Sequence, residues 1–422
     1  MNRDSLPLPP SRRRMSERAS GQFFRMASVI AGVFVPTDKQ LESLDERYAA
    51  IGTFLVNSAE FGALTLEVHG HGSRQIGTLV RPLHVRELGY DVDAILLLKE
   101  GALQLYAGSA GARRLINDLH NVLERYAKQQ GLVIEKWDRC VTLIYADGVR
   151  VDVAPVIAHP LLAVASGDTH GLIPDRSLQL YVPTNPRGLE RGFNAAAKVR
   201  AVFTRVLKEA RSAETVARGD VTPLPDANVV SQRLLSIFVQ LMKVHRNIMF
   251  GAPKDGQEDF APTSIFFTTL AAAAYTLRAP QPHDTPLELL LDVFETMPTC
   301  FQRESLGGGR QRWLLPNPYA PGDDLAQSMN TPQKQAAFQQ WHSRFSDDIG
   351  ALLDSIEDRA GHVETERLVE SAFGSRAASA VHAASAPHAP TRQAGRSVVF
   401  GTATGTLMSL PAQANTNFGS PR

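Results

Sequence analysis

At 422 residues the chain is long enough for two domains, each with a hydrophobic core of its own. Its formal net charge of +1 gives no overall field that would draw it to nucleic acid or to a membrane surface. The two cysteines, Cys140 and Cys300, are too few and too far apart for a disulfide framework or a CxxC metal site, which indicates a reducing, cytoplasmic setting. The longest apolar run, residues 26–35, is too short to span a bilayer, and no A-x-A-like cleavage site comes after it, so export is the minority interpretation.

The N-terminal segment is rich in arginine. Its first 27 residues hold six arginines and three prolines against two acidic residues, which predicts a disordered basic arm over residues 1–35. Thr37 and Gln40 then have the spacing of a capping box, and apolar residues recur at helical spacing over residues 41–55. This pattern predicts an amphipathic helix, and the alternation of residues 64–69 predicts a strand after it.

A glycine-rich segment, GHGSRQIGT, occupies residues 70–78. Gly72 lets a ligand approach the backbone closely, and Ser73 offers an amide and a hydroxyl at a predicted helix start, as a phosphate-binding turn requires. His69 and His71 flank this turn without cysteine partners, which favours structural roles over metal binding. A lone Gly-Ser pair is most often a plain turn, so the segment indicates a function only in combination with nearby carboxylates.

The strand predicted at residues 90–99 carries two carboxylates at its beginning. Side chains alternate between the faces of a strand, so Asp91 and Asp93 point the same way and repel each other. A third carboxylate, Asp152, lies in a later strand that a mixed sheet can place beside the first. Bound Mg²⁺ or Mn²⁺ ions would offset the repulsion, because hard cations bind carboxylate and phosphate oxygens. The order of Gly-Ser turn, DVD strand and later strand aspartate predicts a nucleotidyltransferase site.

The rest of the chain is mainly helical in pattern. A second amphipathic helix is predicted over residues 109–128, and helical patterns dominate from about residue 190 to residue 358. After Glu370 the chain has no acidic residue and is rich in alanine, serine and proline, which predicts a disordered tail. An apolar segment at residues 397–410 could add a strand to a partner's sheet, although a plain disordered end is the simpler interpretation.

Three segments, GSRQIGTLVRP, YDVDAILLL and VRVDVAP, resemble the DNA polymerase β-like nucleotidyltransferase superfamily. Within that superfamily the sequence is most similar to the bacterial CD-NTases, which are relatives of cyclic GMP–AMP synthase and oligoadenylate synthase. The resemblance covers residues 36–350. Four later segments contribute to it: 172–189, 241–250, 261–270 and 314–325.

The resemblance implies a catalytic centre with two Mg²⁺ or Mn²⁺ ions. Three aspartates would bind these metals and carry catalysis: Asp91, Asp93 and Asp152. Gly72 and Ser73 would hold the donor triphosphate. One of the aspartates, Asp152, would also accept the proton of the attacking hydroxyl.

The resemblance implies further nucleotide contacts outside the catalytic strands. Lys243 and Ser264 match positions that contact the triphosphate from the helical domain, and Asn185 matches a position that reads a base edge. From the residues alone, Lys243 is equally a surface lysine, Ser264 a helix N-cap and Asn185 a turn residue. Tyr181 stands where the family usually has tryptophan, so stacking on a base at this position is in doubt.

The expected fold is α+β, with a polymerase β-like nucleotidyltransferase core on a mixed sheet, a helical C-terminal domain and the active site between them. We expect four regions in chain order: a basic arm at 1–35, the nucleotidyltransferase core at 36–215, the helical domain at 216–370 and a disordered Ala/Ser/Pro-rich tail at 371–422.

The implied activity is the joining of nucleoside triphosphates, ATP among them, into a cyclic di- or trinucleotide second messenger with release of pyrophosphate. The implied role is cytoplasmic anti-phage signalling of the CBASS type. The chain has no zinc-ribbon cysteines, so no DNA activator is expected. A regulatory protein partner is expected, and the C-terminal tail is its candidate contact. Two other classes stay open: a linear oligonucleotide synthase or a transferase acting on RNA or a small molecule, and a nucleotide-binding pseudoenzyme. The intact Gly-Ser pair and aspartates argue against the pseudoenzyme.

Overall fold

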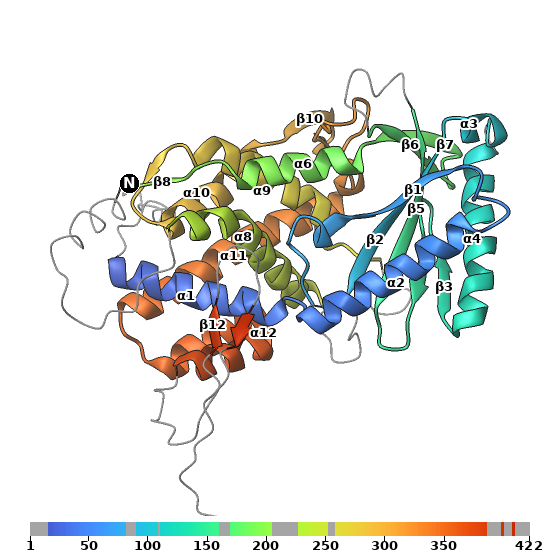
Figure 1. The fold of residues 1–422 in the computed structure, drawn as a ribbon. Helices are drawn as coiled ribbons and strands as arrows, with labels where there is room; N and C mark the ends of the chain where they lie inside the picture. The colour runs from blue at the N-terminus through green and yellow to red at the C-terminus, as the bar shows by residue number, and fades with distance from the viewer. Residues whose placement is uncertain are drawn as a thin grey trace, which may run out of the picture.

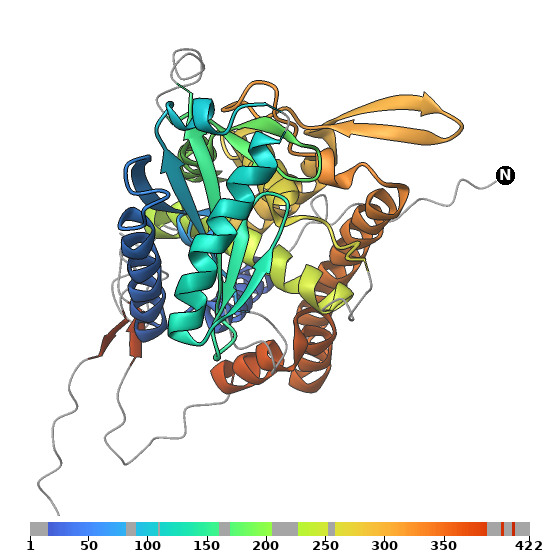
Figure 2. The ribbon, with the colours of Figure 1, turned by 90° about the vertical axis from the view of Figure 1, so that its right-hand side faces the viewer.

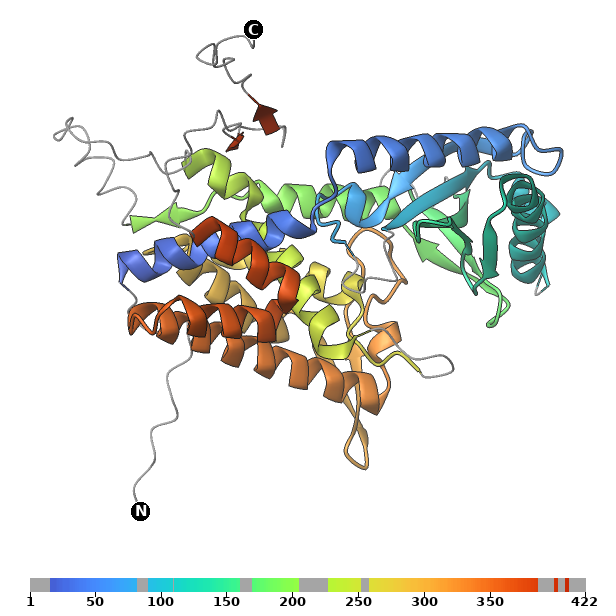
Figure 3. The same cartoon turned by 90° about the horizontal axis from the view of Figure 1, so that it is seen from below.

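The chain forms two lobes, one built on a β-sheet and the other built from helices (Figure 1). The view from below separates the lobes clearly (Figure 3). Together they confirm the expected α+β class. In the part of the chain that is described, no helix is both long and apolar enough to cross a membrane. The computed structural model describes these residues: 16–81, 90–108, 110–159, 169–204, 227–251, 258–385, 398–400 and 407–409.

A mixed seven-stranded sheet organises the first lobe. Its strands follow the order β1-β2-β5-β4-β3, with β6 paired to β5 and β7 paired to β6. Strands β2 and β5 run parallel, and the other pairs are antiparallel. The strands have these bounds: β1 Thr65–His71, β2 Asp91–Leu98, β3 Val133–Lys136, β4 Val141–Ile144, β5 Arg150–Ala158, β6 Gly171–Asp175 and β7 Leu180–Thr184.

Two amphipathic helices, α2 (Asp38–Val56) and α4 (Gly111–Gln130), pack on this sheet, with the short α3 (Ala102–Leu105) preceding α4. Both long helices were predicted from apolar periodicity, and both predictions are confirmed. The capping box is also present, because the Thr37 side chain accepts from the Gln40 N–H and the Gln40 side chain accepts from the Thr37 N–H. The buried helix faces and the inner face of the sheet form one hydrophobic core.

The second lobe is a helical bundle around an aromatic core. Phe266 stacks on Trp313 with ring centroids 5.9 Å apart and meets Phe338 edge-on at 5.4 Å. A β-hairpin, β10–β11, projects from this lobe (Figure 2). The helices have these bounds: α1 Glu17–Phe34, α6 Pro186–Ala197, α8 Ala227–Phe250, α9 Ser264–Arg278, α10 Pro286–Thr296, α11 Pro332–Glu357 and α12 His362–Ser385. The remaining elements are short: β8 Val202–Phe203, β9 Pro282–His283, η3 Met297–Thr299, β10 Gln302–Gly307, β11 Arg310–Leu314 and η4 Gln327–Met329.

The prediction of a disordered arm is wrong for residues 16–34. This segment forms α1, which Ser16 caps with its side chain and which packs against α8, α11 and α12. Apolar residues three and four positions apart, from Phe23 to Phe34, bury one face of the helix in the helical lobe. The prediction of disorder was based on the many arginines in the segment and overlooked the helical spacing of these apolar residues. The start of the predicted arm, residues 1–15, lies outside the described residues.

The predicted disordered tail is wrong for residues 371–385, which complete α12. Phe373 is 1% exposed in the helical core, and the helix kinks at Gly374, where φ is +84°. Alanine dominates this segment, so its composition resembles a low-complexity tail although alanine is the strongest helix former. Beyond Ser385 the structure describes two short strands that pair with each other: β12 Val398–Phe400 and β13 Leu407–Ser409.

The two lobes have separate hydrophobic cores that do not follow chain order. Phe193 and Ala196 of α6 are buried in the helical core, although residues 36–215 were expected to form the other domain. Helix α1 joins the same core from the N-terminal side. The predicted boundary at residues 215 and 216 lies outside the described residues.

A carboxylate-lined cleft between the lobes

A cleft of about 740 Å³ lies between the two lobes. The sheet lobe contributes side chains from β2 and β5 and the short 3₁₀ turn η2 (Gly72–Arg74), and the helical lobe contributes α6, α8 and α9. All of the site residues predicted from sequence except Asn185 line this cleft: Gly72, Ser73, Asp91, Asp93, Asp152, Lys243 and Ser264.

The carboxylates come together because β2 and β5 are adjacent parallel strands. Asp93 pairs in register with Asp152, and Asp91 pairs with Arg150. The expectation that a mixed sheet places these strands side by side is therefore confirmed. His71 of β1 is the register partner of Asp93 on the other side, which brings the glycine-rich turn to the same edge of the sheet.

Burial makes the negative charge in this cluster costly. Desolvation, followed by the charges of Asp152 and Asp91, raises the pKa of Asp93 to about 7. Desolvation also raises the pKa of Asp152, although a hydrogen bond from Thr142 Oγ1 to Asp152 Oδ1, 2.5 Å long, opposes that rise. The cluster therefore favours a proton or a cation at Asp93 at neutral pH.

The carboxylate oxygens of the cleft suit a hard divalent cation, provided that a bound ligand supplies the remaining coordination. Among the residues that the structure describes, no group of three or more His, Cys, Asp or Glu side chains could hold a metal ion on its own. Asp91 stands toward solvent, with its side chain 72% exposed and Oδ1 3.8 Å from Arg150 Nε. Carboxylate oxygens are nevertheless the ligands that Mg²⁺ shares with substrate phosphates.

Gly72 is required by the backbone and by the space around it. Its φ of +73° lies in the left-handed region, and a Cβ placed there would lie 1.9 Å from Asp93 Oδ2. The turn is closed by a hydrogen bond from Thr78 N to Ser73 O, 2.9 Å long. A helix start was predicted at Ser73, and the structure shows a 3₁₀ turn in which Ser73 is the second residue and lines the cleft.

Lys243 connects the helical lobe to the glycine-rich turn. It is 6% exposed, so the interpretation as a surface lysine is wrong. Its Nζ donates to Thr78 O at 3.1 Å and to Thr78 Oγ1 at 3.2 Å. Desolvation is the main cause that lowers the pKa of Lys243 to about 7, and the charge of Arg246 acts in the same direction while Asp93 and Asp91 oppose it. A negatively charged ligand in the cleft would favour its protonated form.

The beginning of α9 and the end of α8 complete the helical wall. Ser264 is the first residue of α9 and lines the cleft, whereas Thr263 is the N-cap, so the N-cap interpretation of Ser264 is wrong. Sequence reasoning missed Arg246 and Asn247, which also line the cleft. The spacing of Arg246, one helical turn after Lys243, could have indicated that it shares the same face. Its guanidinium donates to Pro262 O at 3.0 Å.

Asn185 does not line the cleft. It is fully buried, and it caps α6 by accepting from Gly188 N at 2.8 Å. Its Oδ1 also accepts from Thr169 Oγ1 at 2.6 Å, while its Nδ2 donates to Tyr319 O at 2.8 Å. The predicted contact with a base edge is therefore not supported, because both ends of the amide are already engaged within the protein.

Tyr181 does not line the cleft either. Its hydroxyl donates to Tyr106 O at 3.0 Å, and its ring packs against the core of the sheet lobe. The aromatic residue that does line the cleft and is partly exposed is Tyr319, which sequence reasoning missed. His71 also lines the cleft, and burial lowers its pKa to about 4, so it is neutral at physiological pH.

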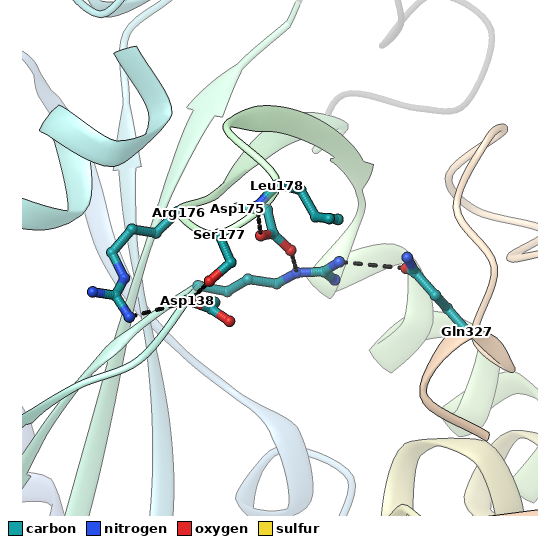
Figure 4. Close-up of polar contacts among 7 residues, drawn as sticks. Asp138, Asp175, Arg176, Ser177, Leu178 and Gln327 are labelled. Atoms are coloured by element: carbon teal, nitrogen blue, oxygen red, sulfur yellow. Dashed lines mark hydrogen bonds and ion pairs between the residues drawn. The ribbon is translucent and has the colours of Figure 1, made fainter. Parts of the chain in front are cut away.

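A second connection between the lobes runs through Arg139 (Figure 4). Its Nε donates to Asp175 Oδ2 at 3.0 Å, and its Nη2 donates to Gln327 Oε1 of the helical lobe at 3.4 Å. Asp175 Oδ1 also accepts from Leu178 N and so holds the turn between β6 and β7. Asp175 therefore fixes a turn and an arginine that reaches the other lobe.

Carboxylates on neighbouring strands, facing a Gly-Ser turn across a cleft, suit the transfer of a nucleotidyl group to a hydroxyl. The fold and the cleft thus define a nucleotidyltransferase. Residues 31–195 match the family model of the Second Messenger Oligonucleotide or Dinucleotide Synthetase domain, which gives the narrower class. Over this region and beyond it, the chain is similar to bacterial CD-NTases.

Two relatives of known activity are similar in sequence. The c-di-GMP synthase of Roseivirga ehrenbergii is 27% identical over 295 residues, which are 67% of this chain and 66% of that protein. The chain therefore spans about two thirds of the length of that relative. The cyclic dinucleotide synthase CdnG of Bradyrhizobium diazoefficiens is 24% identical over 364 residues, 79% of each chain.

Solved structures show the same fold at lower identity. The complex of Bradyrhizobium diazoefficiens CdnG with GTP superposes with a TM-score of 0.58 at 19% identity, covering 85% of this chain and 97% of that one. The E. coli MS115-1 CdnC:HORMA-deltaN complex gives a TM-score of 0.53 at 16% identity, with the same coverage.

Proposed function

We propose that this protein is a metal-dependent cyclic dinucleotide synthase that joins two nucleoside triphosphates with release of pyrophosphate. The observation that carries the proposal is the register pairing of Asp93 with Asp152 beside Gly72, at the edge of a cleft that both lobes line. The relatives named as dinucleotide synthases favour a dinucleotide over a trinucleotide. We infer that the protein acts in the cytoplasm, where its nucleoside triphosphate substrates are made.

Two divalent ions, Mg²⁺ or Mn²⁺, would be held by Asp91, Asp93 and Asp152 together with phosphate oxygens of the substrate. When bound, these ions neutralise the phosphates and the carboxylates. Burial raises the pKa of Asp152, which is the direction that makes a carboxylate a stronger base. We therefore assign to this carboxylate the acceptance of the proton from the attacking hydroxyl.

The chain itself positions the donor triphosphate from both sides. Backbone N–H groups and the hydroxyl of Ser73 face the phosphates from the glycine-rich turn. Lys243 and Ser264 face them from the helical lobe, and Arg246 adds a second positive charge on the same wall. Holding both reactants between two lobes replaces an encounter in solution by a step within one complex, and this accounts for much of the catalysis.

The biological role that we infer is anti-phage signalling by a cyclic dinucleotide. CdnC, one structural relative, is described in complex with a HORMA protein. We extend from it only the idea of a regulatory protein partner, and the C-terminal tail after Ser385 remains the candidate contact. Binding of that tail to a co-purified partner, and its loss on truncation, would test this part of the proposal.

The activity is tested by incubating the purified protein with each nucleoside triphosphate, alone and in pairs, and Mg²⁺ or Mn²⁺. We expect pyrophosphate release and a product whose mass equals two nucleoside monophosphates joined with loss of two waters. A product that forms only after RNA or a small-molecule acceptor is added would contradict the proposal and favour a transferase. Nucleotide binding without any turnover would favour a pseudoenzyme.

A further inference from the structure

Two aromatic residues line the described part of the cleft, Phe193 and Tyr319. Phe193 is 5% exposed and belongs to the helical core, whereas Tyr319 is partly exposed next to Pro318. We propose that Tyr319 is the platform on which the nucleobase of a bound nucleoside triphosphate stacks, and that Asn185 positions this platform. The inference rests on the proposed function and names a base-binding residue of the same cleft.

The backbone of Tyr319 is held from both sides. Its N–H donates to Asn317 Oδ1 at 3.0 Å, and its carbonyl accepts from Asn185 Nδ2 at 2.8 Å. Asn317 is 3% exposed and Asn185 is fully buried, so neither amide is weakened by competing water. Asn317 is itself fixed through a hydrogen bond from Nδ2 to Asp323 Oδ2, 2.8 Å long. The loop therefore presents Tyr319 in a defined position.

The side chain of Tyr319 lies against bare backbone of α6. Gly188 and Gly192 are one turn apart on this helix and share a face. A Cβ at Gly192 would lie 2.1 Å from Tyr319 Oη and 2.4 Å from Cε2, and a Cβ at Gly188 would lie 2.6 Å from Tyr319 Cβ. Any larger residue at either position would displace the tyrosine. The two glycines thus make room for the side chain along its whole length.

A ring supported by a helix on one side offers its other side to a flat ligand. Nucleobases stack on tyrosine in a way that tolerates any base, because every base has a π-face. The triphosphate end of the cleft is defined separately, by Asp93 and Lys243. This arrangement also gives Asn185 a new role: it does not read a base edge, but holds the residue that contacts the base.

Binding measured in the absence of turnover tests the platform. The probes are 2′,3′-dideoxy-GTP and 2′,3′-dideoxy-ATP, which lack both acceptor hydroxyls, and inorganic tripolyphosphate, which lacks a base. Tyr319→Leu should weaken binding of the better-bound nucleotide by about tenfold to a hundredfold, while tripolyphosphate binding stays within about twofold. Tyr319→Phe, which keeps the aromatic face, should retain most of the nucleotide affinity.

The positioning role of Asn185 has its own test. In Asn185→Ser the hydroxyl can still accept from Gly188 N and cap α6, but it is too short to donate to Tyr319 O. We expect an intact melting transition, nucleotide binding weakened about tenfold and tripolyphosphate binding unchanged. Nucleotide affinities equal to wild type in Tyr319→Leu, or in Asn185→Ser, would overturn the corresponding part of the inference. If wild type bound the dideoxynucleotides but made no cyclic product, the proposed activity would fail while the platform could still stand.

Discussion

Asp93 and Asp152 are register partners on two adjacent parallel strands, and Asp93 also lies where a side chain on Gly72 would have to be. These two relationships place carboxylates and a glycine-rich turn at one edge of the sheet. Burial raises the pKa of both carboxylates, so the folded chain carries an electrostatic cost that only a cation or a proton removes. Because the buried carboxylates do not stabilise the fold, metal and phosphate binding explain their presence better than a structural role does.

Replacing Asp91 and Asp93 together by asparagine should abolish pyrophosphate release without loss of the fold. The carboxylates are useful only with metal bound, and their removal relieves the repulsion with Asp152. We expect the melting temperature of the metal-free double variant to equal or slightly exceed that of wild type. Pyrophosphate release at the wild-type rate would contradict the proposed site.

Mg²⁺ binding should depend on pH through Asp93. Its folded pKa of about 7 exceeds the ordinary value, so its contribution to the free energy of unfolding is fully present below about pH 4 and is lost as pH rises through about 7. Mg²⁺ must displace that proton, so its affinity should fall by about tenfold per pH unit below 7. Calorimetric titration of the nucleotide-free protein at pH 6 and pH 8 measures this difference, and Asp93→Asn should remove it. Equal affinities at the two pH values would show that Asp93 does not bind the metal.

Gly72→Ala should inactivate the protein. The left-handed backbone alone costs alanine about 1–2 kcal/mol, and the new Cβ would displace Asp93. The control is Gly101→Ala, because Gly101 is exposed, has φ of −57° and has open space around its Cβ position. Pyrophosphate release and thermal melting are measured for both variants, and only Gly72→Ala should lose activity. Full activity in Gly72→Ala would mean that the turn can move away from the carboxylate.

Truncation should separate α12 from the tail beyond it. Deleting residues 386–422 leaves the helix complete and should preserve nucleotide turnover. Deleting residues 371–422 removes Phe373 from the helical core and should lower the free energy of unfolding by about 3–5 kcal/mol or more. Chemical denaturation of the two truncated proteins gives the comparison. Loss of basal turnover in the shorter deletion would assign the tail a catalytic role.

Local patterns predicted the catalytic strands well and the lobe boundaries poorly. The alternation in DVD, the capping box at Thr37 and the glycine-rich turn are short-range features, and each depends on residues close in sequence. The helical character of α1 depends instead on a face that packs against α12, far along the chain. The role of Asn185 depends on Tyr319, 134 residues away, and no local pattern contains that contact.

We propose that the three aspartates catalyse the formation of a closed product from nucleoside triphosphates. Closure requires the linear intermediate to present its own triphosphate to the site that formed it, and proximity favours this step over further growth. The most direct measurement is the fate of the labelled product of the wild-type protein on treatment with alkaline phosphatase. We expect a product whose mass and mobility the phosphatase leaves unchanged, because a ring has no terminal phosphate, and no such product from the Asp91→Asn, Asp93→Asn variant. A phosphatase-sensitive ladder would contradict the claim and identify a linear oligonucleotide synthase.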